Sequence, residues 1–73
     1  MNREDLRRIL RSRGVNPARY SLDGGLAHDT TCLEYRHKKK WCVYYTERGY
    51  RFDERCFDTE EEACEDLLAR IFP

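Results

Sequence analysis

The chain has 73 residues, and its 14 lysines and arginines balance 14 aspartates and glutamates, so its net charge is zero although 38% of it is charged. This length suits one small domain over residues 1–73 and excludes a second hydrophobic core. Five tyrosines, three phenylalanines and one tryptophan supply enough apolar surface to exclude a disordered chain. No apolar run approaches the ~20 residues that cross a bilayer, and the charged N-terminal residues do not resemble a signal peptide. We therefore expect a cytoplasmic protein without membrane association.

The charged residues are unevenly distributed along the chain. Residues 1–40 carry ten basic and five acidic side chains, whereas residues 41–73 carry four basic and nine acidic ones. Two outcomes are open for such a chain. Its two halves can neutralise each other in the folded domain, or one of them can face a partner of opposite charge.

The N-terminal segment is predicted to form a helix at residues 3–13. Asn2 can cap its N-terminus, and Gly14 can end it. Apolar residues recur at the spacing of a helix face, at Leu6, Ile9 and Leu10.

The C-terminal segment is predicted to form a second helix at residues 59–71. A capping box can open it in either of two frames, one beginning at Thr59 and the other at Asp58. Its apolar face consists of Ala63, Cys64, Leu67, Leu68 and Ile71.

Three strands are predicted between the helices, at residues 31–36, 41–46 and 50–57, the last with a possible bulge. A short extended piece at residues 20–22 can add a fourth. The intervening segments are polar, and they are residues 26–30, 37–40 and 47–49. Because the last two connections are too short for parallel crossovers, the strands form an antiparallel meander. The fold class is therefore α+β, a three-stranded and possibly four-stranded antiparallel meander with two helices on one face, in the order α-β-β-β-α.

Four cysteines raise the possibility of a metal site or a disulfide. They lack the Cys-x-x-Cys pairs that present two thiolates to zinc, and each lies within a predicted element, so buried reduced thiols are expected. A disulfide and a metal are the alternatives. Cys32 and Cys42 are the pair that could become cross-strand neighbours and oxidise, and the sequence leaves their redox state open.

Catalysis is not expected. His28 and His37 fall in predicted loops, away from any arrangement of nucleophile and base. Gly24 and Gly25 precede neither a helix nor a phosphate-binding lysine. We therefore expect no catalytic residues, no cofactor and no metal, and a function in binding.

Nucleic-acid binding is one such function, because the order α-β-β-β-α is also that of double-stranded RNA-binding domains. Those domains place basic residues at the start of the last helix, where this chain has Glu60, Glu61 and Glu62. These carboxylates would repel phosphates, so a nucleic-acid-binding module is the alternative hypothesis. Its basic residues would be Arg3, Arg7, Arg11 and Lys38–Lys40.

Protein binding is favoured by the acidic C-terminal half. Its carboxylates, from Asp53 to Asp66, follow three tyrosines at positions 44, 45 and 50. Tyrosines are effective interface anchors, and carboxylates steer and pair with a basic surface. An adaptor for an unrelated protein, or a homodimer joined through an open sheet edge, is a further possibility.

Several runs resemble small bacterial immunity proteins, which are encoded beside polymorphic toxins of the contact-dependent or type VI-delivered kind. The sharpest is Trp-Cys-Val-Tyr-Tyr-Thr-Glu-Arg-Gly at residues 41–49, and the others are residues 20–25, 32–34 and 57–64. The resemblance implies a non-enzymatic inhibitor that covers the active site or substrate groove of a cognate toxin domain, which would present a basic cleft. The contacts we expect on this basis are Tyr44, Glu47, Arg48, Tyr50, Asp53, Glu54, Glu61 and Glu65. The basic connection from Arg36 to Lys40 departs from a purely acidic binding face.

Overall fold

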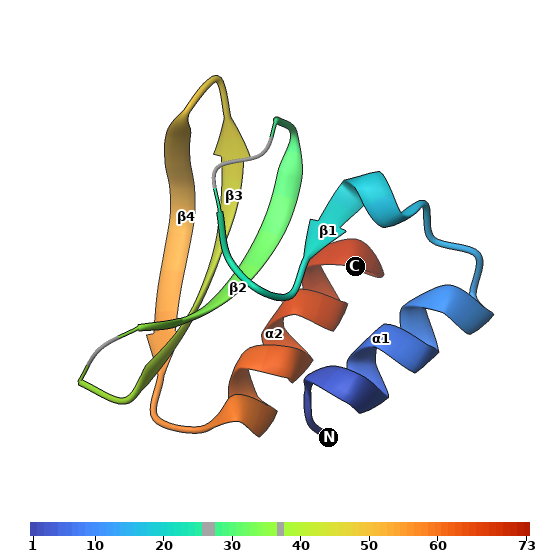
Figure 1. Cartoon of the computed structure of the whole chain (residues 1–73), viewed down its shortest axis with the longest axis horizontal. Coiled ribbons are helices and arrows are strands. Elements are labelled where there is room, and N and C mark those ends of the chain that lie inside the picture. Colours follow the sequence, from blue (N-terminus) through green and yellow to red (C-terminus); the bar gives the residue numbers. More distant parts are fainter. Residues whose placement is uncertain (26–27, 37) are drawn as a thin grey trace.

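A computed structural model of the chain describes residues 1–25, 28–36 and 38–73 (Figure 1). Its elements, in chain order, are α1 (Arg3–Ser12), the 3-10 turn η1 (Pro17–Arg19), β1 (Tyr20–Ser21), β2 (Thr30–Arg36), β3 (Lys40–Glu47), β4 (Tyr50–Phe57) and α2 (Glu60–Ile71). Each predicted helix and strand is present, with ends within one residue of the prediction. The predicted connections at residues 26–30 and 37–40 include Leu26, Ala27 and His37, which lie outside the described residues.

The strands form one sheet in the order β1-β2-β3-β4. The antiparallel meander of β2, β3 and β4 confirms the prediction. The short β1 pairs with β2 in parallel, through Tyr20 with Thr31 and Ser21 with Cys32, so the sheet is mixed. The prediction that a fourth strand would extend the antiparallel meander is therefore wrong. The chain after Ser21 passes back along the sheet, where the Gly24 N–H donates to the Leu33 carbonyl, and β2 then starts in the same direction as β1.

Local capping fixes the ends of both helices. At the start of α1 the Asp5 N–H donates to the Asn2 side-chain oxygen at 2.9 Å, and the Asn2 N–H donates to the Asp5 carboxylate at 3.2 Å. The helix ends before Gly14, whose φ of +71° suits glycine, and the Val15 N–H returns to the Leu10 carbonyl. At the start of α2 the Glu62 N–H donates to the Thr59 hydroxyl, so Thr59 is the capping residue.

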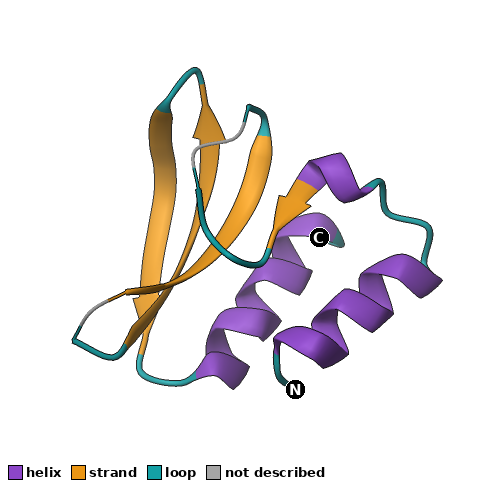
Figure 2. Ribbon diagram, in the orientation of Figure 1, coloured by secondary structure: helices purple, strands orange, loops and turns teal. Residues whose placement is uncertain are grey.

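The hydrophobic core lies between the sheet and the two helices. Both helices lie on the same side of the sheet, with α1 beside α2 (Figures 1 and 2). Leu6, Leu33 and Leu67 come from three different elements, and all are fully buried. Burying a side chain of this size stabilises the fold by about 1.5–3 kcal/mol. The other buried members of this core are Leu10, Val15, Leu22, Val43, Ala63, Cys64 and Ile71. Neither helix is long and apolar enough to cross a membrane.

Strand β4 lies at the edge of the sheet and carries the predicted bulge. Its register with β3 shifts between Val43 and Tyr45, and Asp53 has a φ of +52°, in the left-handed region. A non-glycine residue in this conformation is strained by about 1–3 kcal/mol. The Arg70 guanidinium from α2 donates to the Asp53 carbonyl at 2.6 Å, and this contact ties the bulge to the helix.

The cysteines differ from the prediction. Cys42 and Cys56 form a disulfide, whereas Cys32 and Cys64 are free and buried. Cys42 and Cys56 lie directly opposite each other in the β3–β4 register, with Cα atoms 4.0 Å apart. Cys32 instead lies opposite Tyr44, so the expected Cys32–Cys42 neighbourhood is wrong. The pairing depends on strand register, which the spacing of cysteines in the sequence does not specify.

Candidate functional site

An open hollow of about 660 Å³ lies on the helix side of the sheet. It lies between the β3–β4 hairpin, the C-terminal part of α2 and η1. Residues from five elements line it: Arg19, Thr31, Tyr45, Asp53, Glu54, Arg55, Asp66, Ala69 and Arg70. The hairpin extends beyond the end of α2 (Figure 1), which leaves this part of the sheet face uncovered.

Exposed aromatic side chains border the hollow. Phe52 pairs with Tyr45 across β3 and β4, and Tyr50 pairs with Glu47, so these side chains leave the sheet on the same face. Tyr50 is 68% exposed and Phe52 is 45% exposed. We call the exposed end of the hairpin, Tyr45, Glu47, Arg48, Tyr50, Phe52 and Asp53, the hairpin surface. Aromatic groups exposed together in this way are typical of binding surfaces.

Two other exposed aromatic residues differ from this pair. Tyr35 is 49% exposed, but its ring lies 4.4 Å from that of Trp41. Phe72 receives the Arg13 guanidinium at 5.0 Å. Within the described chain, Tyr50 and Phe52 make neither kind of contact. They are therefore the aromatic groups that a partner could cover at the least cost to the domain.

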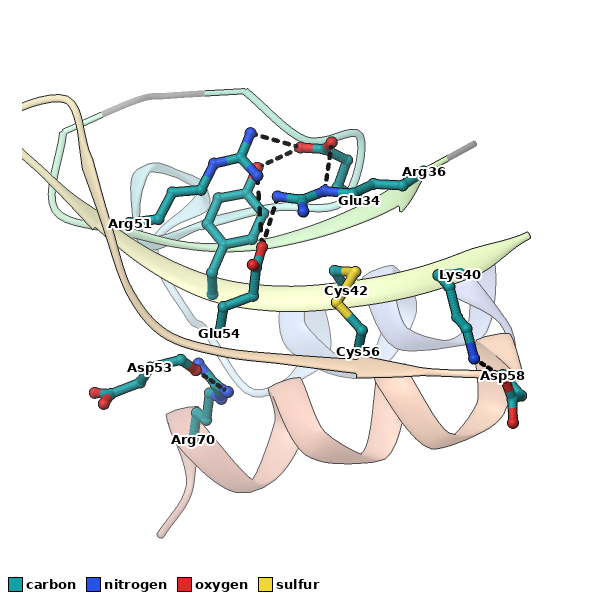
Figure 3. The surroundings of a disulfide bond; sticks show 11 residues. Glu34, Arg36, Lys40, Cys42, Arg51, Asp53, Glu54, Cys56, Asp58 and Arg70 are labelled. Carbon is teal, nitrogen blue, oxygen red and sulfur yellow. Dashed lines mark hydrogen bonds and ion pairs between the residues drawn. A yellow bond between two sulfur atoms is a disulfide. The ribbon is translucent and has the colours of Figure 1, made fainter. Parts of the chain in front are cut away.

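Charges in the hollow are only partly paired. Arg70 binds the Asp66 carboxylate at 2.9 Å, and Arg55 approaches the same carboxylate at 3.8 Å. Arg19 forms no ion pair with any described residue. The Asp53 carboxylate points away from Arg70, which contacts only its carbonyl (Figure 3). The hollow therefore offers both a cation and a carboxylate to an incoming group.

The opposite face of the sheet carries a closed ring of four ion pairs. Glu34 contacts Arg36 at 3.2 Å and Arg51 at 3.6 Å, and Glu54 contacts the same two arginines at 2.6 and 3.4 Å (Figure 3). We call these four residues the ion-pair ring. Two of the contacts, Arg36 to Glu54 and Arg51 to Glu34, join the basic half of the sequence to the acidic half. Each half contributes one arginine and one glutamate, so the ring is neutral overall and leaves the charge asymmetry between the halves unchanged.

Tyr44 lies beneath the ion-pair ring and is fully buried. Its hydroxyl donates to Glu34 at 2.6 Å, and the Arg51 guanidinium lies 4.6 Å from the centre of its ring. Burial, and then the Glu34 carboxylate, raise the pKa of the Tyr44 hydroxyl well above its ordinary value. Tyr44 is therefore a structural residue with no surface for a partner, and its expected role as a contact is corrected.

Strand alternation alone does not reveal that Tyr44 is buried. Strand alternation places it on the face away from the helices, which the sequence pattern leaves open to solvent. In the folded chain the carbonyl of Gly25 reaches the Tyr44 hydroxyl at 3.1 Å, and two guanidiniums close the rest of the space. A loop and two long side chains therefore cover what the pattern alone presents as an exposed tyrosine.

The remaining expected contacts divide into three groups. Glu47, Arg48, Tyr50 and Asp53 are exposed and lie together on the hairpin surface. Glu54 belongs to the ion-pair ring. Glu61 and Glu65 are exposed on α2, with Glu61 in its first turn, at the opposite end of β4 from the hairpin turn. The structure therefore brings together the first group, and it does not bring α2's two carboxylates to that surface.

The charge asymmetry is partly neutralised between the two halves of the chain. Arg3 binds Glu60 at 3.5 Å, and Lys40 binds Asp58, and both contacts join a basic residue of the first half to a carboxylate of the second. Five of the expected contacts form no ion pair within residues 1–25, 28–36 and 38–73, namely Glu47, Arg48, Asp53, Glu61 and Glu65. Some charges are therefore paired internally, and others are left to solvent.

Sequence reasoning missed Phe52, Arg19 and Arg70 as parts of this region. Phe52 could have been found, because it alternates with Tyr50 in a strand whose other residues are mostly charged. Arg19 and Arg70 reach the hollow from η1 and α2 through tertiary packing. No local pattern in the sequence indicates that these two arginines lie near the hairpin.

One cluster of the described chain has the donors of a metal site. A carboxylate oxygen of Glu54 and the sulfurs of Cys42 and Cys56 all lie within 4.8 Å of one another. In the present structure the two sulfurs are joined as a disulfide, which is not a metal ligand set.

Comparisons with known proteins found no matching family model, no similar curated protein and no similar solved structure. Fold and surface define this molecule as a small α+β domain with an open, aromatic hairpin surface.

Proposed function

We propose that this chain is an immunity protein, which binds a cognate toxin domain and neutralises it by covering its active site or substrate groove. The observation that carries the proposal is the exposure of Tyr50 and Phe52 next to the carboxylates of Glu47 and Asp53, which form no ion pair with any described residue. The resemblance of residues 41–49 to immunity proteins supplies the class of partner.

The chemistry of the hairpin surface suits a basic cleft. Tyrosine and phenylalanine bury a large area at a small loss of side-chain freedom, and such residues dominate binding energy in many interfaces. Carboxylates beside them accelerate encounter with a basic partner and fix its orientation. Toxin domains that act on nucleic acids or nucleotides require positive charge in their substrate groove, so a narrow hairpin that presents aromatic residues and two carboxylates is a suitable plug.

Rigidity supports the same proposal. The two strands of the hairpin are cross-linked by the Cys42–Cys56 disulfide, and its bulge is held to α2 by the Arg70 contact to Asp53. A surface that is already ordered loses little conformational entropy on binding. Inhibition by occlusion needs no catalysis, and we propose none for this chain.

The arrangement of basic residues favours this proposal over nucleic-acid binding. Arg3 pairs with Asp23 and Glu60, and Arg7 pairs with Glu4 at 2.7 Å. These guanidiniums are neutralised in place. The first turn of α2 keeps its three glutamates, where an RNA-binding domain of this topology needs cations.

Co-expression tests the proposal directly. The chain is produced together with the toxin domain encoded by the adjacent reading frame, and growth and complex formation on gel filtration are measured. We expect protection of growth and a complex that elutes as one species. Loss of protection, absence of a complex, or salt-dependent retention on double-stranded RNA with no toxin binding would contradict the proposal.

A pair of variants locates the binding surface. Replacing Tyr50 and Phe52 together by alanine is expected to weaken binding at least ~30-fold, which corresponds to the loss of one aromatic anchor. Tyr35→Ala is the matched control, because Tyr35 is as exposed as Phe52 and lies toward the other end of the sheet. If the double variant and the Tyr35→Ala variant bind the toxin domain with equal affinity, the interface lies elsewhere on the domain.

A further inference from the structure

The disulfide and Glu54 form a compact cluster on the sheet face opposite the helices. Cys42 comes from β3, and Glu54 and Cys56 come from the edge strand β4 (Figure 3). Their donor atoms lie within 4.8 Å of one another. Cys42 is buried and Cys56 is exposed, so one side of the cluster is covered by protein and the other is open to solvent.

We propose that the reduced chain binds one zinc ion through the thiolates of Cys42 and Cys56 and the carboxylate of Glu54. Zinc accepts sulfur ligands at ~2.3 Å and carboxylate oxygen at ~2.0–2.2 Å in a tetrahedral arrangement, so its ligands lie roughly 3.3–3.8 Å from one another. Side-chain rotation alone can bring the three donors from their present positions to this spacing. The fourth position faces solvent beside Cys56 and would hold water.

The surrounding charges suit this ligand set. Arg36 and Arg51 both contact the same oxygen of Glu54, Oε2, at 2.6 and 3.4 Å. The second carboxylate oxygen therefore remains for a metal. Two thiolates and one carboxylate around Zn²⁺ leave one excess negative charge, which the two guanidiniums offset. The thiolate is the form of cysteine that binds metal.

The other two cysteines are separate from the cluster. Cys64 lies on the buried face of α2, where burial raises the pKa of its thiol to about 11. Burial also raises the pKa of the Cys32 thiol. Both are protonated at neutral pH, and they serve as internal controls.

The Cys42–Cys56 disulfide must be reduced before zinc can bind. A phosphine reductant takes the oxygen of one water, and its two hydrogens go to the sulfurs of Cys42 and Cys56 as the disulfide bond breaks. Binding of Zn²⁺ then releases both thiol protons to solvent. In the reverse direction, glutathione disulfide accepts two electrons from the two thiolates and two protons from solvent. Two glutathione thiols form, the Cys42–Cys56 bond closes, and the zinc ion is released.

Cobalt titration of the whole chain tests this site. The chain is reduced with a phosphine, separated from the reductant without oxygen, and titrated with Co²⁺ as a spectroscopic substitute for zinc. We expect thiolate-to-cobalt charge-transfer absorption and the visible bands of a tetrahedral ion, both saturating at one cobalt per chain and lost on adding one equivalent of Zn²⁺. Oxidation with glutathione disulfide should abolish these bands.

Variants assign the ligands. Cys42→Ser and Cys56→Ser should each abolish the charge-transfer band, and Glu54→Gln should weaken zinc binding at least ~10-fold. Cys64→Ala should bind like the parent chain. Circular dichroism and NMR dispersion report folding of the reduced chain in parallel.

Several outcomes would overturn the proposal. One is a reduced, folded chain that gives no band, and another is a reduced chain that unfolds and does not refold with Zn²⁺. Cobalt bands that persist in the oxidised chain or in both serine variants would equally exclude this ligand set. Toxin binding by the oxidised chain is measured separately, so failure here leaves the proposed inhibitor function intact.

Discussion

The ion-pair ring and the hairpin surface lie on opposite faces of the sheet and share strand β4, and they use their charged and aromatic residues differently. In the ring, Glu34 and Glu54 are each paired with two arginines above a fully buried tyrosine. On the hairpin surface, Tyr50 and Phe52 are exposed, and the nearby carboxylates form no ion pair within the described chain.

From this difference we expect the ion-pair ring to stabilise the fold and the hairpin surface to bind a partner. Side chains of the ring already satisfy one another, so removing one of them disturbs the fold. Side chains of the hairpin surface have few internal partners, so their removal should leave the fold intact and affect only a partner. Strand β4 contributes to both regions, with Arg51 and Glu54 in the ring and Tyr50 and Phe52 on the other face.

The largest expected contrast is between two tyrosines of the same hairpin. Tyr44→Ala should reduce the free energy of unfolding by about 3–5 kcal/mol, because it removes a fully buried aromatic side chain. A domain of this length is stable by roughly 4–11 kcal/mol, so this variant should be close to unfolding. Tyr50→Ala, at an exposed position, should change stability by less than ~0.5 kcal/mol. Urea unfolding followed by circular dichroism measures both, and similar losses would break the distinction between the two regions.

Reduction of the Cys42–Cys56 disulfide is expected to have the next largest effect. The bond spans 14 positions of the sequence, and closing a loop of this size stabilises a fold by about 3 kcal/mol. Thermal unfolding of the reduced chain, with a chelator present to exclude metal, should show a fall in Tm of about 12–24 °C. A fall of less than ~4 °C would mean that the ion-pair ring and backbone pairing hold β4 without the disulfide.

A smaller effect is expected from a single carboxylate of the ring. Glu34→Gln should reduce the free energy of unfolding by about 1 kcal/mol, since its contacts are partly exposed to solvent and screened. This loss should shrink in 1 M salt, where exposed ion pairs are weak. Glu47→Gln on the hairpin surface is the matched control and should be neutral within ~0.5 kcal/mol. Equal stability of the two variants would show that the ring contributes no more than ordinary surface charge.

Much of this fold follows from local sequence patterns. Asn2, Gly14 and Thr59 act within one turn of a helix, and each has the predicted role. Alternation within β2 and β3 places Leu33 and Val43 on the same face of the sheet, and both lie in the core. Short polar connections dictate the antiparallel meander. These features depend on residues a few positions apart, and the sequence displays such relations directly.

The errors concern relations between distant residues. The parallel pairing of β1 depends on the path of the chain after Ser21, and the disulfide depends on the register of β3 with β4. The burial of Tyr44 depends on the Gly25 carbonyl and on two arginines from different strands. Of the candidate site, the exposed hairpin residues followed from turn position and residue type, whereas Arg19 and Arg70 required the tertiary structure.

Hydrogen exchange on the complex with the proposed toxin domain tests whether the hairpin surface is the binding interface. We predict that toxin binding slows amide exchange at residues 45–53 and leaves α1 and the β2 residues of the ion-pair ring unchanged. Protection confined to α1 or to the ring, with residues 45–53 exchanging as in the free chain, would contradict it.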